Sequence, residues 1–197
     1  MVSIYYCDES LIAMKKIIVS EGKFLRLVKK GEWEYVERHN CTGIVIIVAL
    51  THDHKVILVE QYRPPVDKKV IEFPAGLIND ECANGKEDFL KAAERELLEE
   101  TGYKAKRLLK VAEGPVSAGM CSDKVTMVRA VGARKVAQGG GNESESIVVH
   151  EVSVDKIANW LKKMERKGYL IEPKIYAGLY FLREYNEEAF RKKETQS

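Results

Sequence analysis

Three glutamates lie close together near the middle of the chain, at Glu96, Glu99 and Glu100. From Lys86 onward the surrounding residues are mostly strong helix formers, and Gly102 stands where a helix ends in a left-handed cap, so we predict a helix here. At about 100° per residue, the three carboxylates share one face of that helix. Like charges at this spacing repel one another, and a hard divalent cation, which takes oxygen ligands, would relieve the repulsion. The pattern indicates a metal site, although a solvated acidic face would show the same spacing.

The residues around these glutamates form a longer pattern. Residues 95–103 read R-E-L-L-E-E-T-G-Y, and seven residues separate Arg95 from Glu87. This segment resembles the Nudix box, G-x5-E-x7-R-E-U-x-E-E-x-G-U, where U is aliphatic or aromatic. The one departure is that ten residues, not five, separate Gly76 from Glu87. Because Asn84-Gly85 is a turn signal, we expect the five extra residues to bulge outward and to leave the helix intact.

The resemblance implies hydrolysis of a diphosphate with a metal cofactor, Mg²⁺, for which Mn²⁺ is a possible substitute. It places the metal ligands at Glu96, Glu99, Glu100 and the carbonyl oxygen of Ala75, in a tight turn. Arg95 would pair with a carboxylate of the cluster and hold it in place. Arg95, Glu99 and Glu100 therefore count among the catalytic residues.

Two segments before the helix are similar to the Nudix enzymes that cleave ADP-ribose and related nucleotide sugars. They are residues 60–65 (EQYRPP) and 71–78 (IEFPAGLI). In that group an arginine after Q-[YFI] contacts the substrate, so Arg63 is the candidate for binding phosphate through its planar fork of donors. The alternative is an arginine that only caps a strand end. Leu77 is a further expected substrate contact.

The N-terminal region resembles the animal ADP-sugar enzymes at Trp33-Glu34 and Arg38. In those enzymes a tryptophan lies on the adenine and neighbouring residues add polar contacts. Packing of Trp33 in a core between strands is an equal alternative. If the resemblance extends this far, the N-terminal sheet of one subunit reaches into the site of another, and the enzyme is a homodimer.

Two loops after the helix complete the expected site. Glu143 and Glu145 follow a run of glycines, and in isolation such residues would be solvated. The ADP-ribose enzymes, however, have an E-x-E-x-I segment here, which supplies the catalytic base and a metal contact from a loop that closes on substrate. We assign Glu143 as the base and Glu145 as the ligand, with exchangeable roles. The long loop over 113–123 is expected to reach the site, with Gly119 and Met120 against the substrate.

The expected fold class is α/β, a Nudix α/β/α sandwich with a mixed sheet and an additional small N-terminal antiparallel sheet. Residues 1–40 form the N-terminal unit, with strands at 16–20, 24–28 and 33–36. Residues 41–197 form the Nudix domain, with strands at 43–50, 56–62, 70–73, 105–112, 125–131 and 146–152. Two C-terminal helices, at 155–164 and from about 172 to 190, show ordinary core stripes.

Composition excludes several classes of protein. The 197 residues carry a net charge of +2, which makes no electrostatic case for nucleic acid or a membrane as a partner. The longest apolar run, at 44–50, is too short to span a bilayer, and the start of the chain lacks the features of a signal peptide. The four cysteines form no C-x-x-C pair, so neither a zinc site nor a disulfide framework is indicated. We expect a cytoplasmic protein with reduced thiols.

The predicted reaction is ADP-ribose plus water giving AMP and ribose 5-phosphate. Two alternatives stay open. The substrate could be another nucleoside diphosphate sugar, a dinucleoside polyphosphate or a coenzyme, because the box specifies the diphosphate and not its substituents. The protein could also be a nucleotide-binding sensor that has lost catalysis, although every carboxylate of the box is present.

Overall fold

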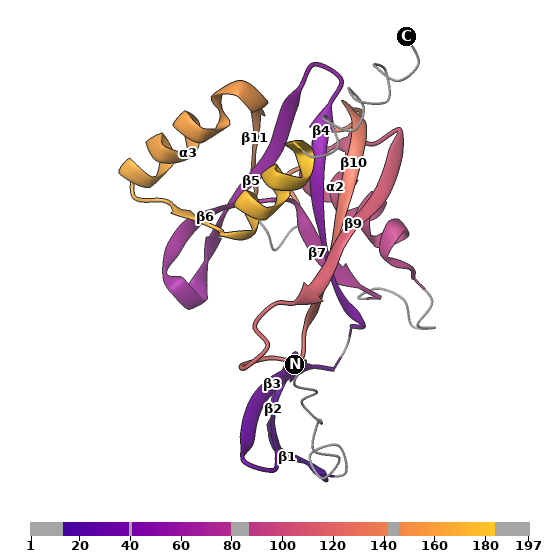
Figure 1. Ribbon diagram of the computed structural model, residues 1–197, viewed down its shortest axis with the longest axis vertical. Helices are drawn as coiled ribbons and strands as arrows, with labels where there is room; N and C mark the ends of the chain where they lie inside the picture. The colour runs from indigo at the N-terminus through magenta and orange to yellow at the C-terminus, as the bar shows by residue number, and fades with distance from the viewer. Residues whose placement is uncertain (1–13, 40, 80–86, 142–145, 184–197) are drawn as a thin grey trace, which may run out of the picture.

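A small sheet opens the part of the chain that the structure describes. The computed structural model describes residues 14–39, 41–79, 87–141 and 146–183. Three antiparallel strands follow one another in chain order: β1 (Lys16–Glu21), β2 (Leu25–Lys30) and β3 (Trp33–Arg38) (Figure 1). Gly31, at φ 60°, makes the turn between the last two, where a residue without Cβ is favoured. The predicted N-terminal meander is confirmed.

The larger sheet contains nine strands among the described residues. Its main path runs β12-β6-β5-β4-β10-β8, with β11 paired to β5, β7 to β4 and β9 to β10. The strands are β4 (Gly43–Thr51), β5 (Lys55–Arg63), β6 (Lys68–Glu72), β7 (Ala75–Ile78), β8 (Tyr103–Lys104), β9 (Arg107–Pro115), β10 (Lys124–Lys135), β11 (Val148–Ser153) and β12 (Leu170–Ile171). Because β4 pairs with β10 in parallel and with β7 antiparallel, the sheet is mixed, as predicted.

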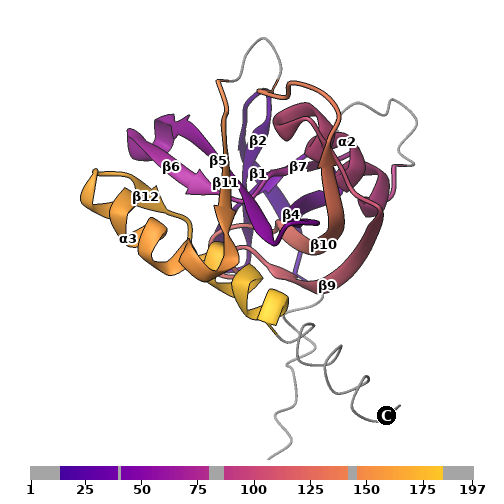
Figure 2. The same ribbon diagram turned by 90° about the horizontal axis from the view of Figure 1, so that it is seen from above.

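Helices cover both faces of this sheet (Figure 2). They are α2 (Phe89–Thr101), α3 (Ile157–Arg166) and the helical residues 174–183. Alternate residues of β4 serve two cores: Ile47 packs in the core that contains Leu97 of α2, and Val48 packs in the core that contains Leu161 of α3. A strand buried on both faces needs a continuous apolar run, which explains the sequence of β4. Among the described helices, none is long and apolar enough to cross a membrane.

Several boundaries differ from the predictions. Helix α2 begins at Phe89, not Lys86, because the side chain of Asp88 accepts hydrogen bonds from the backbone N–H groups of Leu90 and Lys91 and so caps the first turn. The helix ends as predicted at Gly102, in the left-handed conformation with φ 73°. The strand expected over 105–112 begins later and ends later, as β9, with the short β8 before it, and β7 occupies residues that the prediction left as a loop.

The N-terminal sheet is joined to the rest of the same chain. The N–H of Val36 donates to the carbonyl oxygen of Met120 at 2.9 Å, and the N–H of Ser122 donates to the carbonyl oxygen of Val36 at 3.1 Å. Nearby, Arg38 Nε lies 3.1 Å from Asp123 Oδ2. Strand β3 is therefore anchored on the loop that connects β9 to β10.

Candidate active site

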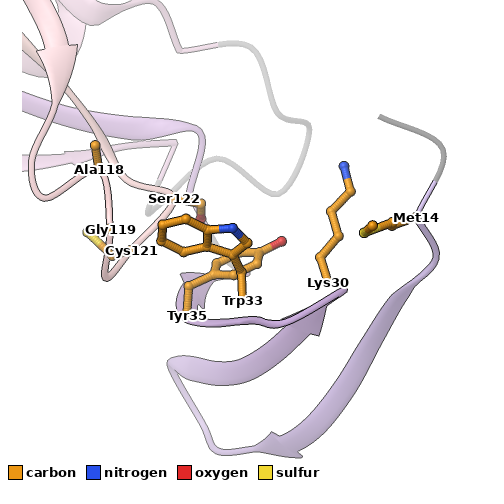
Figure 3. A pocket seen from close by; sticks show the side chains of 8 residues that line it. All are labelled: Met14, Lys30, Trp33, Tyr35, Ala118, Gly119, Cys121 and Ser122. Carbon is orange, nitrogen blue, oxygen red and sulfur yellow. The ribbon is translucent and has the colours of Figure 1, made fainter. Parts of the chain in front are cut away.

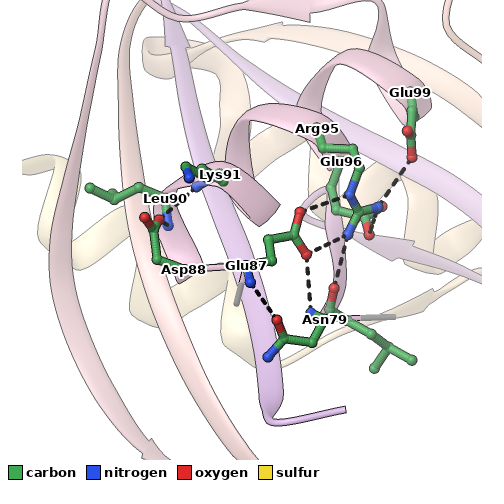
Figure 4. A network of polar contacts seen from close by, with 9 residues as sticks. Asn79, Glu87, Asp88, Leu90, Lys91, Arg95, Glu96 and Glu99 are labelled. Carbon is green, nitrogen blue, oxygen red and sulfur yellow. Dashed lines mark hydrogen bonds and ion pairs between the residues drawn. The ribbon is translucent and has the colours of Figure 1, made fainter. Parts of the chain in front are cut away.

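One guanidinium organises the acidic cluster on α2 (Figure 4). Arg95 donates from Nε to Glu87 at 3.0 Å, and from Nη1 to Glu96 at 2.7 Å and to Glu99 at 3.3 Å. Its Nη2 donates to the carbonyl oxygen of Leu77 at 3.0 Å. The predicted pairing of Arg95 with cluster carboxylates is thus present, and it also ties α2 to β7. Leu77, expected to contact substrate, holds this arginine through its backbone.

Glu87 occupies a defined place despite the longer spacing that precedes it. Its backbone N–H donates to Asn79 Oδ1 at 2.6 Å, and the N–H of Asn79 donates to Glu87 Oε2 at 3.0 Å. Hydrogen bonds from Arg95 lower the pKa of the Glu87 carboxyl. Burial would lower the pKa of Arg95, but its bonds to Glu87 and the charge of Glu96 raise it overall. Both groups therefore stay ionised at neutral pH.

Strand β7 and helix α2 touch at two further points. A Cβ on Gly76 would lie 1.9 Å from the carboxyl group of Glu96, so any other residue here would displace that carboxyl group. The N–H of Ala75 donates to Glu100 Oε2 at 3.1 Å, and Glu100 is only 3% exposed. The turn that was predicted to offer a carbonyl ligand therefore lies directly against two of the predicted carboxylate ligands.

The oxygen atoms are of the kind that binds a hard divalent cation. In the part of the chain that the structure describes, however, no three acidic, histidine or cysteine side chains are arranged around a common point. The carboxylates are directed to different partners, because Arg95 contacts Glu96 and Glu99 while Glu100 accepts from the backbone N–H of Ala75. Carboxylate and carbonyl oxygens are the ligands that Mg²⁺ takes.

A cavity of about 410 Å³ lies beside Trp33 (Figure 3). It is lined by residues of β2, β3, the segment before β1 and the loop that precedes β10: Met14, Lys30, Trp33, Tyr35, Ala118, Gly119, Cys121 and Ser122. Trp33 is 59% exposed, so the alternative that it packs in a core is wrong. An exposed indole at the wall of a cavity is a surface on which a planar base can stack.

Of the other predicted substrate contacts, some line this cavity and others do not. Gly119 lines it next to the Trp33 ring, whereas Met120 is 63% exposed and is not part of the lining. Glu34 is exposed, and as the neighbour of Trp33 on a strand it points to the opposite face. Arg38 pairs with Asp123 at the base of the loop.

Outside the loop at 113–123, which was expected to reach the site, sequence reasoning missed three residues of the cavity: Tyr35, Lys30 and Met14. The signal for Tyr35 was available, because residues i and i+2 of a strand share one face and Trp33 precedes it at that spacing. No comparable local signal places Met14 there, because it comes from outside the strands.

Arg63 lies on a different element from the carboxylates. It ends β5, and its Nε is 2.7 Å from Glu72 Oε2 at the end of β6. The side chain of Arg63 is 42% exposed and that of Glu72 is 12% exposed. Arg63 is therefore held at a strand end and is also accessible to a ligand. Glu143 and Glu145 lie outside the described residues.

Comparison with known proteins agrees with this architecture. A family model described as NUDIX domain matches residues 41–171. The "Methanol dehydrogenase activator" of Bacillus methanolicus is 32% identical over 122 residues, which are 61% of this chain and 63% of that protein. The "ADP-ribose pyrophosphatase" of Saccharomyces cerevisiae is 28% identical over 182 residues, 85% and 75% of the two chains. The "ADP-sugar pyrophosphatase" of Mus musculus is 36% identical over 123 residues, 54% and 51%.

The match to several of these relatives is partial, since the chain covers less than two thirds of the Bacillus methanolicus protein and about half of the mouse protein. Among solved structures, "Crystal structure of ADP compounds hydrolase" superposes with a TM-score of 0.66 over 89% of this chain and 93% of that one, at 19% identity. At that identity the likeness establishes the fold alone. The helix, its arginine and the matched domain together show that the chain belongs to the Nudix family.

Proposed function

We propose that this protein hydrolyses the diphosphate bond of ADP-ribose or a related nucleoside diphosphate sugar, with Mg²⁺ as cofactor, to a nucleoside monophosphate and a sugar phosphate. The observation that carries the proposal is the charge of the α2 cluster. The guanidinium of Arg95 contacts the carboxylates of Glu87, Glu96 and Glu99, and buried Glu100 follows Glu99 on the same helix. Similarity to proteins named ADP-ribose and ADP-sugar pyrophosphatases supports the choice of substrate class.

The carboxylates of α2 would hold the cation. A bound divalent cation neutralises the diphosphate oxygens and promotes deprotonation of the attacking water. Glu96, Glu99 and Glu100 supply the oxygens, together with the carbonyl of Ala75. Arg95 contacts Glu96 and Glu99, so a cation that binds these carboxylates would replace part of those contacts.

The groups that would recognise the substrate come from elements other than α2. The cavity beside Trp33 has an aromatic wall, to which Tyr35 also contributes, and its volume of about 410 Å³ is large enough for a nucleobase. Lys30 adds a positive charge at the same cavity. Arg63 binds a phosphate oxygen in exchange for part of its contact with Glu72. We assign Glu143 as the general base and Glu145 as a further metal ligand, with exchangeable roles, from the sequence pattern.

We also propose that the enzyme is a homodimer and that the N-terminal sheet forms part of the interface. All six residues of β1 are exposed. Among them, Ile17, Ile18 and Val19 are about half exposed, at 55%, 49% and 53%, and Phe24 next to β2 is 60% exposed. A cluster of apolar side chains on a small sheet is stabilised when a second copy covers it.

Product analysis tests the proposed activity. The purified protein is incubated with Mg²⁺ and, separately, ADP-ribose, other nucleoside diphosphate sugars, dinucleoside polyphosphates and a nucleotide coenzyme, and the products are separated by chromatography. We expect AMP and ribose 5-phosphate from ADP-ribose at a higher kcat/KM than for the other compounds. Faster turnover of another compound would reassign the substrate, and no mononucleotide from any of them would support the sensor alternative.

A pair of variants on one helix tests the residues. Glu100→Gln keeps an acceptor for the N–H of Ala75 and removes the charge, so we expect kcat to fall by about 100-fold or more with the melting temperature little changed. Glu94→Gln is the matched control, because Glu94 is an exposed glutamate on the same helix. Wild-type activity in Glu100→Gln would refute the assigned metal site.

A further inference from the structure

The C-terminal end of α2 is completed by residues far along the chain. The last carbonyl groups of a helix have no partners within it. Here the carbonyl oxygen of Glu99 accepts from the N–H of Gly141 at 3.1 Å, and that of Glu100 accepts from the N–H of Gly140 at 2.8 Å. The carbonyl oxygen of Gly102 accepts from Val136 and Ala137, at 2.8 and 3.0 Å. Residues 136–141, which we call the glycine clamp, therefore cap the helix from outside.

The two backbones meet at a distance that excludes side chains. A Cβ on Gly139 would lie 2.3 Å from the carbonyl carbon of Thr101, and a Cβ on Gly102 would lie 2.1 Å from the carbonyl oxygen of Ala137. Both glycines have positive φ, 71° and 73°. Gly140 also has a positive φ, 113°, but a Cβ there would meet nothing within 4 Å. Gly139 is thus the residue of the clamp at which an added methyl group collides with the helix.

The clamp acts on the turn that carries two proposed metal ligands. Acidic side chains at a helix C-terminus lie at the negative end of the helix dipole, which is unfavourable, and the last turn of α2 contains no basic residue. The N–H groups of Gly140 and Gly141 supply partial positive charge at this end. Glu100 is consequently fixed twice, by Gly140 at its backbone and by Ala75 at its carboxylate.

We propose that the glycine clamp positions Glu99 and Glu100 for metal binding and that Gly139 is its positioning residue. The inference rests on the proposed metal site. Gly139 lies outside the Nudix box, and we infer that it affects the affinity for the cation through the backbone of α2. Carboxylates held in place lose little freedom when they bind a cation, so displacement of their backbone weakens affinity.

The test compares three glycine-to-alanine variants of the full chain. Gly139→Ala adds both a collision and backbone strain, Gly140→Ala adds strain alone, and Gly168→Ala is the matched control. Gly168 also has a positive φ, 89°, with nothing within 4 Å of an added Cβ, and it follows α3, outside the clamp. The measurements are Mn²⁺ affinity without substrate, counting only the binding that Glu100→Gln abolishes, and the melting temperature.

We expect Gly139→Ala to bind Mn²⁺ about tenfold or more weakly than wild type at a temperature where it is folded, Gly140→Ala to show a smaller loss, and Gly168→Ala to show none. A purely structural role would lower the melting temperature of Gly139→Ala without changing affinity, and that result would overturn the inference. If Gly139→Ala does not fold, the comparison of Gly140→Ala with Gly168→Ala decides, and equal affinities refute the clamp. Failure of the wild type to bind Mn²⁺ would instead refute the proposed metal site itself.

Discussion

Two charged clusters in this protein have opposite compositions. On α2, the guanidinium of Arg95 contacts three carboxylates, those of Glu87, Glu96 and Glu99. In the N-terminal sheet, the single carboxylate of Glu37 accepts from Lys16 Nζ and from Arg26 Nε, each at 3.0 Å. Both clusters connect segments distant in sequence, and both are partly buried.

The difference distinguishes a charged cluster that only stabilises the fold from a charged cluster that can bind a ligand. Burial alone would raise the pKa of Glu37, but hydrogen bonds from Lys16 and Arg26 outweigh it and lower the pKa. The charge of Glu37 is balanced by Lys16 and Arg26, so this cluster needs no bound ion. In the α2 cluster one guanidinium contacts three carboxylates, and under the proposed function a divalent cation binds there as well.

The largest expected effect comes from removing the central cation of the α2 cluster. Arg95→Met leaves three carboxylates side by side without their partner, so we expect the free energy of unfolding to fall by about 3 kcal/mol in urea titrations without divalent metal. Arg26→Met is the matched variant in the N-terminal cluster. Its loss should be about 1 kcal/mol or less, because Glu37 keeps Lys16 as a partner. Equal losses would contradict the proposed difference between the clusters.

A divalent cation should stabilise one cluster only. Mg²⁺ at 100 times its dissociation constant stabilises a folded protein by about 2.7 kcal/mol, and a chelator reverses this. We expect Mg²⁺ to raise the melting temperature of wild type and of Glu37→Gln alike, and to raise that of Glu100→Gln much less. Scanning calorimetry of the three proteins measures the effect. An equal rise in Glu100→Gln would place the cation elsewhere.

Acid should weaken the α2 cluster through Glu87. Its pKa in the folded protein is below the ordinary 4.5, because Arg95 donates to it. The interaction therefore stabilises the fold at pH values above 4.5 and is lost as the pH falls through the lower folded value. Glu87→Gln should be less stable than wild type at pH 7, and the gap should close at acid pH. A gap independent of pH would show that packing, not charge, is responsible.

The smallest effect is expected at Lys16. Its side chain is 45% exposed, and Glu37 retains Arg26 when it is removed. Lys16→Met should change the free energy of unfolding by about 0.5 kcal/mol or less. Hydrogen exchange should show faster opening of β1 without change on α2. A larger effect would mean that the N-terminal cluster carries more of the stability than its exposure indicates.

The features predicted correctly from sequence are those with local signals. The end of α2 at Gly102 follows from a local signal, a glycine in the left-handed conformation, and the two-sided burial of β4 follows from its apolar run. The pairing of Arg95 with Glu99 also follows from helical spacing, because the two residues are four apart.

The features that were missed depend on contacts between distant segments. Nothing near Gly139 indicates that its backbone touches Thr101, and nothing near Val36 indicates hydrogen bonds to the loop before β10. Glu72 likewise meets Arg63 although the pairing of β5 with β6 places neither residue opposite the other. A single sequence reports periodicity and turns but not which distant surfaces will meet.

The reciprocal hydrogen bonds between Asn79 and Glu87 have a consequence for how this family can vary. They fix Asn79 and Glu87 to each other as the two ends of the segment that connects them, while α2 and β7 are joined separately by Arg95. Extra residues inserted between such ends add only a slowly growing entropy of closure, about 0.6 kcal/mol for each doubling of loop length. The segment before the helix is therefore a place where evolution, or an engineer adding a peptide tag, can change length without moving a carboxylate.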